Sequence, residues 1–184
     1  DHAQRPYQVW KRKIHTSPDK DQLIWEERDE RFFLGVRRSR NGKYVLLSAS
    51  SKVTSEVRVI PTTDLDAKPE VVLERRQGVE YSVSIGDDCY WIRSNENAQN
   101  FMVYSLRSGK KEVLIPHDAS VFIQGINAFS QRLVLRIRRN GLPGVIVVNL
   151  ETNEESFVQI LNRETPNDIK MNTSGIIRVG TLSG

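Results

Sequence analysis

Few side chains in this 184-residue sequence are of the types that act as nucleophiles or metal ligands. Cys89 is the single cysteine, so the sequence predicts no disulfide and no thiolate metal cluster. It lies in the apolar run 89–92 with no histidine nearby in sequence, which favours a small buried side chain over a catalytic thiol. The three histidines, His2, His15 and His117, are not at metal-ligand spacing, and we expect them on the surface. The sequence therefore indicates no metal and no cofactor.

A serine nucleophile would need a Gly-x-Ser-x-Gly motif on a sharp turn from strand to helix, which exposes the hydroxyl beside an oxyanion hole. The nearest sequences are Thr173–Gly175 and Thr181–Gly184, and both lack the first glycine at the required spacing. The chain also lacks the alternation of strands and helices that builds such an α/β sheet. We therefore assign no catalytic residue to this sequence.

A run of charged residues over 26–31 is the candidate contact site. Its side chains could form salt bridges to another domain and so help to hold the two domains together. The alternative is a solvated charged turn, which would contribute little free energy. The candidate contact residues are Glu26, Glu27, Asp29, Glu30 and Arg31.

The charge distribution argues against several classes of partner. Lysine and arginine number 27 against 23 aspartates and glutamates, and a net charge of +4 is a weak basis for an acidic partner. Carboxylates lie among the basic residues elsewhere in the chain, as at 74–76, and the basic clusters, such as 37–40 and 136–139, lack an aromatic nucleic-acid-binding motif. We therefore expect solvated faces and no nucleic-acid site. No apolar run approaches the ~20 residues of a membrane span. A lone cysteine fits a reducing, cytoplasmic location.

Short β-type runs fill the chain and recur with a common period. Strands of one recurring type are anchored at Val59, Val103 and Val147, which are 44 residues apart each time. Four strands in each repeat of ~40–50 residues are typical of β-propeller blades, whereas a β-sandwich would not keep a common period. The fourth strands of the repeats are predicted at Leu23–Glu26, Val71–Glu74, Val113–Ile115 and Phe157–Ile160.

The repeat predicts an all-β propeller of about four blades' worth of four-stranded antiparallel sheets. The chain begins with the third and fourth strands of a blade and ends with the first and second strands of another. It therefore divides into a half-blade, three full blades and a second half-blade, over residues 1–30, 31–77, 78–118, 119–162 and 163–184. The two halves could pair and close a four-bladed ring, or the chain could be a slice of a larger propeller. A start at Asp1 without a methionine favours the slice.

Seven short stretches, taken in their order along the chain, resemble segments of a known family. They are Tyr7–Arg12, Leu23–Phe33, Thr54–Arg58, Arg75–Tyr81, Asn100–Phe101, Leu114–His117 and Arg139–Pro143. Together they resemble the propeller of the prolyl oligopeptidase family, and within it the oligopeptidase B-like members most closely. The resemblance covers nearly all of the chain and thins from Glu151 onward.

The resemblance implies a serine peptidase in which a seven-bladed propeller covers an α/β-hydrolase domain and excludes folded proteins from the active site. Oligopeptidase B-like members cut short peptides after Arg or Lys. The chain would then be a non-catalytic, substrate-gating slice of the seven-bladed ring. Its partners would be the C-terminal hydrolase domain of the same parent chain and short peptide substrates. The alternative is a stand-alone four-bladed propeller that acts as a protein-binding scaffold.

Overall fold

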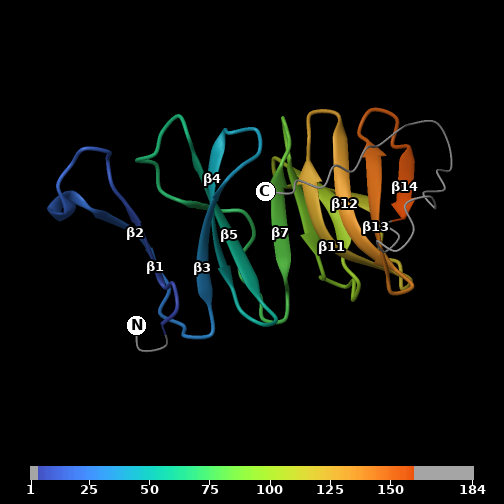
Figure 1. Ribbon diagram of the computed structural model, residues 1–184, viewed down its shortest axis with the longest axis horizontal. Coiled ribbons are helices and arrows are strands. Elements are labelled where there is room, and N and C mark those ends of the chain that lie inside the picture. Colours follow the sequence, from blue (N-terminus) through green and yellow to red (C-terminus); the bar gives the residue numbers. More distant parts are fainter. Residues whose placement is uncertain (1–3, 160–184) are drawn as a thin grey trace, which may run out of the picture.

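The computed structural model of the chain describes residues 4–159. Figure 1 shows the sheets side by side, from a two-stranded sheet at one end to the third of three larger sheets at the other. The two-stranded sheet pairs β1 (Gln8–Lys11) with β2 (Gln22–Glu26) in antiparallel fashion. A short 3-10 helix, η1 (Pro18–Lys20), lies in the connection between them.

Three four-stranded antiparallel sheets follow, and in each of them consecutive strands are neighbours. The first sheet contains β3 (Phe33–Arg38), β4 (Tyr44–Ser50), β5 (Ser55–Pro61) and β6 (Glu70–Val71). The second contains β7 (Tyr81–Ile85), β8 (Tyr90–Ser94), β9 (Met102–Arg107) and β10 (Lys110–Ile115). The third contains β11 (Val121–Ala128), β12 (Arg132–Arg139), β13 (Leu142–Asn149) and β14 (Glu155–Gln159).

These sheets confirm the predicted all-β architecture of four-stranded antiparallel propeller blades. The half-blade predicted over 163–184 lies outside the described residues, and so does the end of the preceding blade. The pairing of the two chain ends that a closed four-bladed ring requires involves that half-blade, and it stays a prediction.

The sheets approach one another most closely at their first strands, β3, β7 and β11. Each of these strands forms one edge of its sheet. β3 contacts β1, β7 contacts β5, and β11 contacts both β7 and β8. Because propeller blades are arranged radially around a central channel, we call these three edges the inner edges of the blades.

Apolar side chains between neighbouring sheets hold the blades together. One cluster contains Val59 of β5 and Val83 of β7, and so joins the first sheet to the second. Another contains Val103 of β9 and Leu135 of β12, and joins the second sheet to the third. All four side chains are almost completely buried, and each contributes about 1.5–3 kcal/mol relative to an exposed position.

Two hairpins show how local turn chemistry sets the register within the sheets. Ser108 and Gly109 connect β9 to β10, and both have positive φ, 48° and 77°. Asn140 and Gly141 connect β12 to β13 with φ of 50° and 82°. Two consecutive residues with positive φ define the type I′ turn, whose twist matches that of an antiparallel pair.

The fourth strand of the first sheet is shorter than predicted. The sequence predicts Val71–Glu74, whereas β6 contains only Glu70 and Val71. The reason lies in the next blade, where the hydroxyl of Tyr81 accepts from the Val57 N–H at 2.7 Å and donates to the Leu73 carbonyl at 2.8 Å. This hydroxyl replaces a direct backbone hydrogen bond, so the strand pairing stops there.

We expect Tyr81→Phe to destabilise the fold by about 1–3 kcal/mol, because the buried Val57 N–H would lose its acceptor. The variant should also reduce the alkaline sensitivity of the chain. Burial raises the pKa of Tyr81 to about 12, while an unfolded tyrosine ionises near 10. The stability of the wild type is therefore fully present below pH 10 and falls between pH 10 and 12.

Urea unfolding at pH 7, 10 and 11 would measure both effects. Tyr7→Phe is the matched control, because the Tyr7 hydroxyl makes no hydrogen bond within the described part of the chain. Tyr90 and Tyr104 also have pKa values raised to about 12 by burial, so part of the alkaline fall should remain in Tyr81→Phe. Equal losses in the two variants at pH 7 would contradict the role given to the Tyr81 hydroxyl.

Candidate functional site

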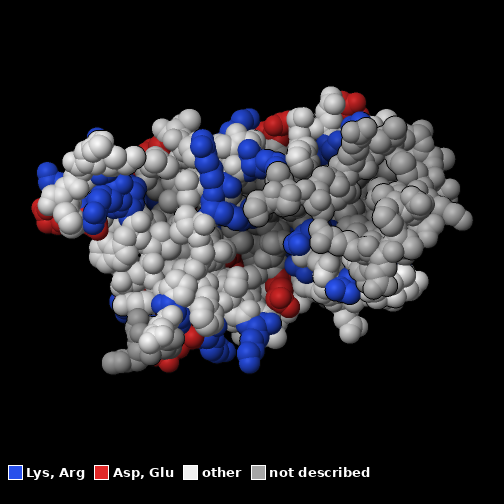
Figure 2. Space-filling view, in the orientation of Figure 1, with Lys and Arg blue, Asp and Glu red and all other residues white. Residues whose placement is uncertain are grey.

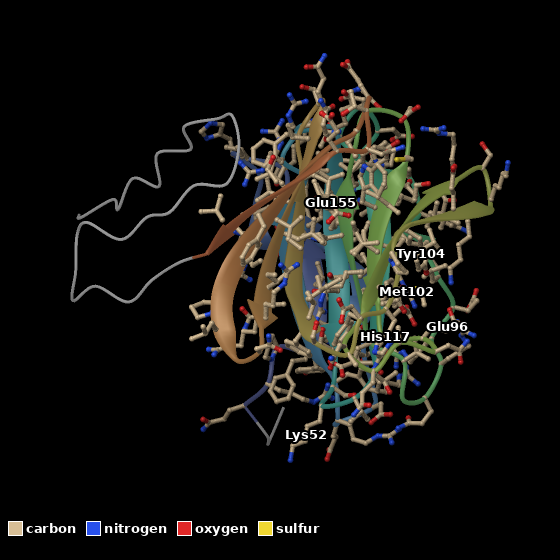
Figure 3. The ribbon with its side chains drawn as sticks, turned by 90° about the vertical axis from the view of Figure 1, so that its right-hand side faces the viewer. Lys52, Glu96, Met102, Tyr104, His117 and Glu155 are labelled. Carbon is tan, nitrogen blue, oxygen red and sulfur yellow. The ribbon has the colours of Figure 1, made fainter. Side chains whose placement is uncertain are left out.

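The links are the segments that connect the last strand of one sheet to the first strand of the next. They lie at the same end of the molecule as the loops that join second to third strands, and we call this end the link end. The Gly78 N–H donates to Thr54 Oγ1 at 3.0 Å, which ties one link to the β4–β5 loop. The Asn140 N–H donates to the Ser120 carbonyl at 3.0 Å, which ties the next link to the β12–β13 turn. Lys52, at the bottom of Figure 3, marks this end.

The predicted contact residues begin at Glu26, the last residue of β2, and continue into the first of these links, and four of the five are at least partly exposed. Glu26 is 3.4 Å from Arg28, and Asp29 is 2.6 Å from Arg31. Hydrogen bonds from Arg31 lower the pKa of Asp29 to about 2. Glu30 is exposed. Surface ion pairs of this kind contribute about 0–1 kcal/mol, so the role of these residues as contacts to another domain stays a prediction.

Glu27 differs from its neighbours because it is buried in a cluster of four charged side chains. Glu27 Oε2 lies 2.5 Å from Arg75 Nη2, and Arg75 Nε donates to Glu56 Oε2 at 3.1 Å. Glu56 also pairs with Arg58 at 2.7 Å. Burial by itself raises the pKa of Glu27, but hydrogen bonds from Arg75 and from the Asp29 N–H bring that pKa below its ordinary value. The cluster joins the two-stranded sheet to the first sheet.

A groove of about 590 Å³ opens at the link end beside the surface part of this run. Glu30 and Arg31 line it together with Phe33, Lys52 and Val53. Phe33 is 55% exposed and Val53 is 49% exposed, so apolar surface lies directly beside charged groups. A patch with apolar residues and a charged rim suits contact with another protein surface.

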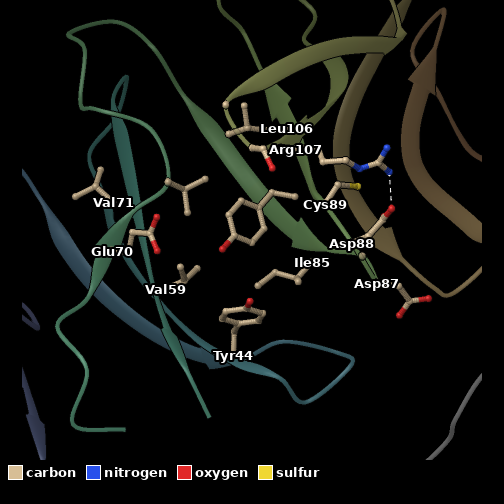
Figure 4. Close-up of a pocket in the computed structure, with 15 residues that line it drawn as sticks. Tyr44, Val59, Glu70, Val71, Ile85, Asp87, Asp88, Cys89, Leu106 and Arg107 are labelled. Carbon is tan, nitrogen blue, oxygen red and sulfur yellow. Dashed lines mark ion pairs between the residues drawn. The ribbon is translucent and has the colours of Figure 1, made fainter. Parts of the chain in front are cut away.

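A second cavity, of about 480 Å³, lies between the first and second sheets and is shown in Figure 4. Val59 and Ile85 line it, together with Cys89 and the ion pair of Asp88 with Arg107, which are 2.7 Å apart. Cys89 is buried, which confirms the prediction of a small buried side chain. Burial also raises the pKa of the thiol, so it is protonated at neutral pH.

Arginine side chains cross from one blade to the inner edge of the next. Arg5 Nη1 donates at 2.7 Å to the carbonyl of the residue before β3. Arg37 of β3 donates to the Val83 carbonyl in β7, and Arg93 of β8 donates to the Ile123 carbonyl in β11 at 2.5 Å. Edge carbonyls are thus satisfied without a strand partner. The sequence alone did not predict this role, because it depends on which strands become neighbours.

Residues 4–159 contain no group of three or more His, Cys, Asp or Glu side chains that could hold a metal ion. In the same part of the chain, no helix has the length and apolar character needed to cross a membrane.

A comparison of the sequence with known protein families gives the same fold as the order and pairing of the strands. Residues 1–179 match the family model of the prolyl oligopeptidase N-terminal beta-propeller domain. The chain belongs to this family. Among curated relatives, Protease 2 of Moraxella lacunata is 32% identical over 152 residues, which cover 81% of this chain and 22% of the relative. Dipeptidyl aminopeptidase BI of Pseudoxanthomonas mexicana is 30% identical over 151 residues, 77% of this chain and 20% of that protein.

Solved structures of the prolyl oligopeptidase family share the fold of the chain. Oligopeptidase B from Trypanosoma brucei, in a closed form with covalently bound antipain, superposes with a TM-score of 0.76 at 28% identity, covering 88% of this chain and 24% of that one. Oligopeptidase B from Leishmania major superposes with a TM-score of 0.76 at 25% identity, covering 81% and 22%. The chain spans about a fifth to a quarter of the length of these relatives.

Proposed function

We propose that the chain is the non-catalytic propeller portion of an oligopeptidase B-like serine peptidase that cleaves short peptides after Arg or Lys. The family match over residues 1–179 carries this proposal. The likeness to two oligopeptidase B structures supports the choice within the family. The role of the propeller would be to restrict access of substrates to a C-terminal α/β-hydrolase domain of the same parent protein, in the cytoplasm.

The stacked sheets suit a restricting role because the blades are closely joined. Apolar clusters fill the space between neighbouring sheets, and arginines bridge from blade to blade at the inner edges. A folded protein could pass through the central channel of such a propeller only if the contacts between blades broke. A short extended peptide would not need the blades to separate.

The link end is the surface that we assign to contact with the hydrolase domain. Its groove places exposed Phe33 and Val53 beside Glu30 and Arg31. Of the predicted contact residues, Glu27 is buried in pairs within the propeller, so it would support this surface rather than contact the partner. Glu26 and Asp29 each have a local arginine partner and would exchange it on docking.

Fluorogenic peptides with Arg, Lys or Pro before the scissile bond would test this function on the full-length protein. We expect cleavage after Arg and Lys at least about 100-fold faster than after Pro, and no cleavage of a folded protein that contains the same residues. We also expect the chain of residues 1–184 to cleave none of these substrates. Preference for Pro, or activity of the 184-residue chain alone, would contradict the proposal.

A further inference from the structure

Two guanidinium groups converge on a short stretch of the inner edge of the third sheet. Arg93 Nε donates to the Ile123 carbonyl at 2.5 Å. Arg136 pairs in register with Gly125, and its Nη2 lies 3.1 Å from the position that a Cβ on Gly125 would occupy. A β-bulge separates Ile123 from Gly125. The bulge bends the strand, and the missing side chain at 125 leaves the space that the Arg136 guanidinium occupies.

In the described part of the chain, no acidic side chain lies close enough to these two groups to form an ion pair. Within residues 4–159, neither Arg93 nor Arg136 takes part in an ion pair, and the Arg136 side chain makes no hydrogen bond. Burial lowers the pKa of Arg93 to about 10; the charge of Glu80 opposes this shift and the nearby charge of Arg136 adds to it. Arg93 therefore stays cationic at neutral pH, and the charge of Arg136 repels it.

Aromatic side chains hold the Arg93 guanidinium in place. Its central carbon lies 3.4 Å from the centroid of the Phe101 ring. Phe101 in turn packs edge to face against Phe122 of β11, with ring centroids 5.6 Å apart. A guanidinium that is stacked and already bonded through Nε loses little side-chain freedom when its remaining N–H groups bind a ligand.

The wider surface is also basic. Figure 2 shows Lys and Arg side chains gathered across the middle of the molecule between β3 and β11, with few acidic side chains among them. A positive surface raises the local concentration of anions before they bind. Two guanidiniums offer paired N–H donors whose geometry matches the two oxygens of a carboxylate.

We propose that Arg93 and Arg136 form a carboxylate-binding site at the inner edge of the third sheet, and that it binds the free α-carboxylate of a short peptide. The choice of a peptide as ligand rests on the proposed function, whereas the choice of a carboxylate rests on the two arginines. The site would retain the C-terminal end of a peptide in the channel and would favour peptides over internal segments of folded chains, which have no terminal carboxylate.

Isothermal titration of the full-length protein would test this site with three acetylated peptides that contain no Arg or Lys. One has a free C-terminus, the second is its C-terminal amide, and the third is an amide with one glutamate side chain. We expect the free acid to bind at least about tenfold more tightly than either amide, as the gain of a charge-assisted hydrogen bond implies.

Arg136→Gln should abolish this tenfold preference, because Arg136 is exposed and its loss removes half of the site. Arg132→Gln is the matched control, since it removes an exposed arginine from the same strand, at the first residue of β12 and four residues before Arg136. It should leave the preference within twofold. Arg93→Lys, which keeps the charge but not the planar fork, should also weaken binding of the free acid.

Equal binding of acid and amide would overturn the proposal, as would equal effects of Arg136→Gln and Arg132→Gln. Binding of the glutamate-containing amide as tightly as the free acid would overturn the assignment to an α-carboxylate. These titrations need no turnover, so they separate the two proposals. A protein that shows the carboxylate preference without peptidase activity would contradict only the proposed function, and an active peptidase without the preference would contradict only this site.

Discussion

Arg75→Ala is expected to lower the free energy of unfolding by about 2–4 kcal/mol, because it leaves two buried carboxylates short of a partner. Arg75 pairs with Glu27 and Glu56, whose side chains are only 9% and 8% exposed. Its guanidinium carbon also lies 4.0 Å from the centroid of the Phe32 ring, a contact that would be lost. Arg75 itself is 26% exposed, which places the effect at the lower end of the range for buried pairs.

Urea unfolding of the chain at pH 7 would measure this loss, with Arg76→Ala as the control. Arg76 is the next residue and also pairs with a glutamate, Glu96 at 2.6 Å, but its side chain is 55% exposed. Its replacement should cost at most about 1 kcal/mol. A similar loss in both variants would show that burial of Glu27 and Glu56 does not set the strength of the cluster.

Leu135→Ala is expected to destabilise the chain by about 2–5 kcal/mol, because it leaves a cavity between the second and third sheets. Leu135 is completely buried and belongs to the cluster that contains Val103 and Ile137. Blades of a repeat protein are stabilised mainly by contacts with their neighbours. The substitution should therefore weaken the junction between two blades and not a single sheet.

Hydrogen exchange together with urea unfolding would check this expectation. The amides of β11 and β12 should exchange faster in Leu135→Ala, while those of β3 and β4 should change less. Leu142→Ala is the control, because Leu142 lies on the neighbouring strand and is 55% exposed. A loss in Leu142→Ala as large as that in Leu135→Ala would count against the buried junction as the cause.

The propeller architecture could be predicted from the sequence because its signals are local. The 44-residue spacing of Val59, Val103 and Val147 places one strand in each of the three four-stranded sheets, β5, β9 and β13. Turn residues such as Asn140 and Gly141 adopt the positive φ that their types favour. The alternation in 136–139 was also informative, since Ile137 is buried and Arg136 is exposed.

The length of the fourth strand in the first sheet could not be predicted in this way. The apolar run Val71–Leu73 has the composition of a strand. It stops pairing after Val71 because the hydroxyl of Tyr81, from the next blade, enters between Val57 and Leu73. No periodic pattern within one blade contains that information.

The candidate sites divide in the same way between sequence and tertiary structure. The repeat, the blade order and the charged run at 26–31 could be predicted from the sequence, because strand periodicity and turn chemistry depend on near neighbours. The family followed from the resemblance of seven short stretches in their order along the chain. The folded structure was needed to show that Glu27 is buried against Arg75, 48 residues away, while Glu30 is exposed. It likewise brought Arg93 and Arg136 to one bulge. Burial and unbalanced charge depend on which distant strands become neighbours.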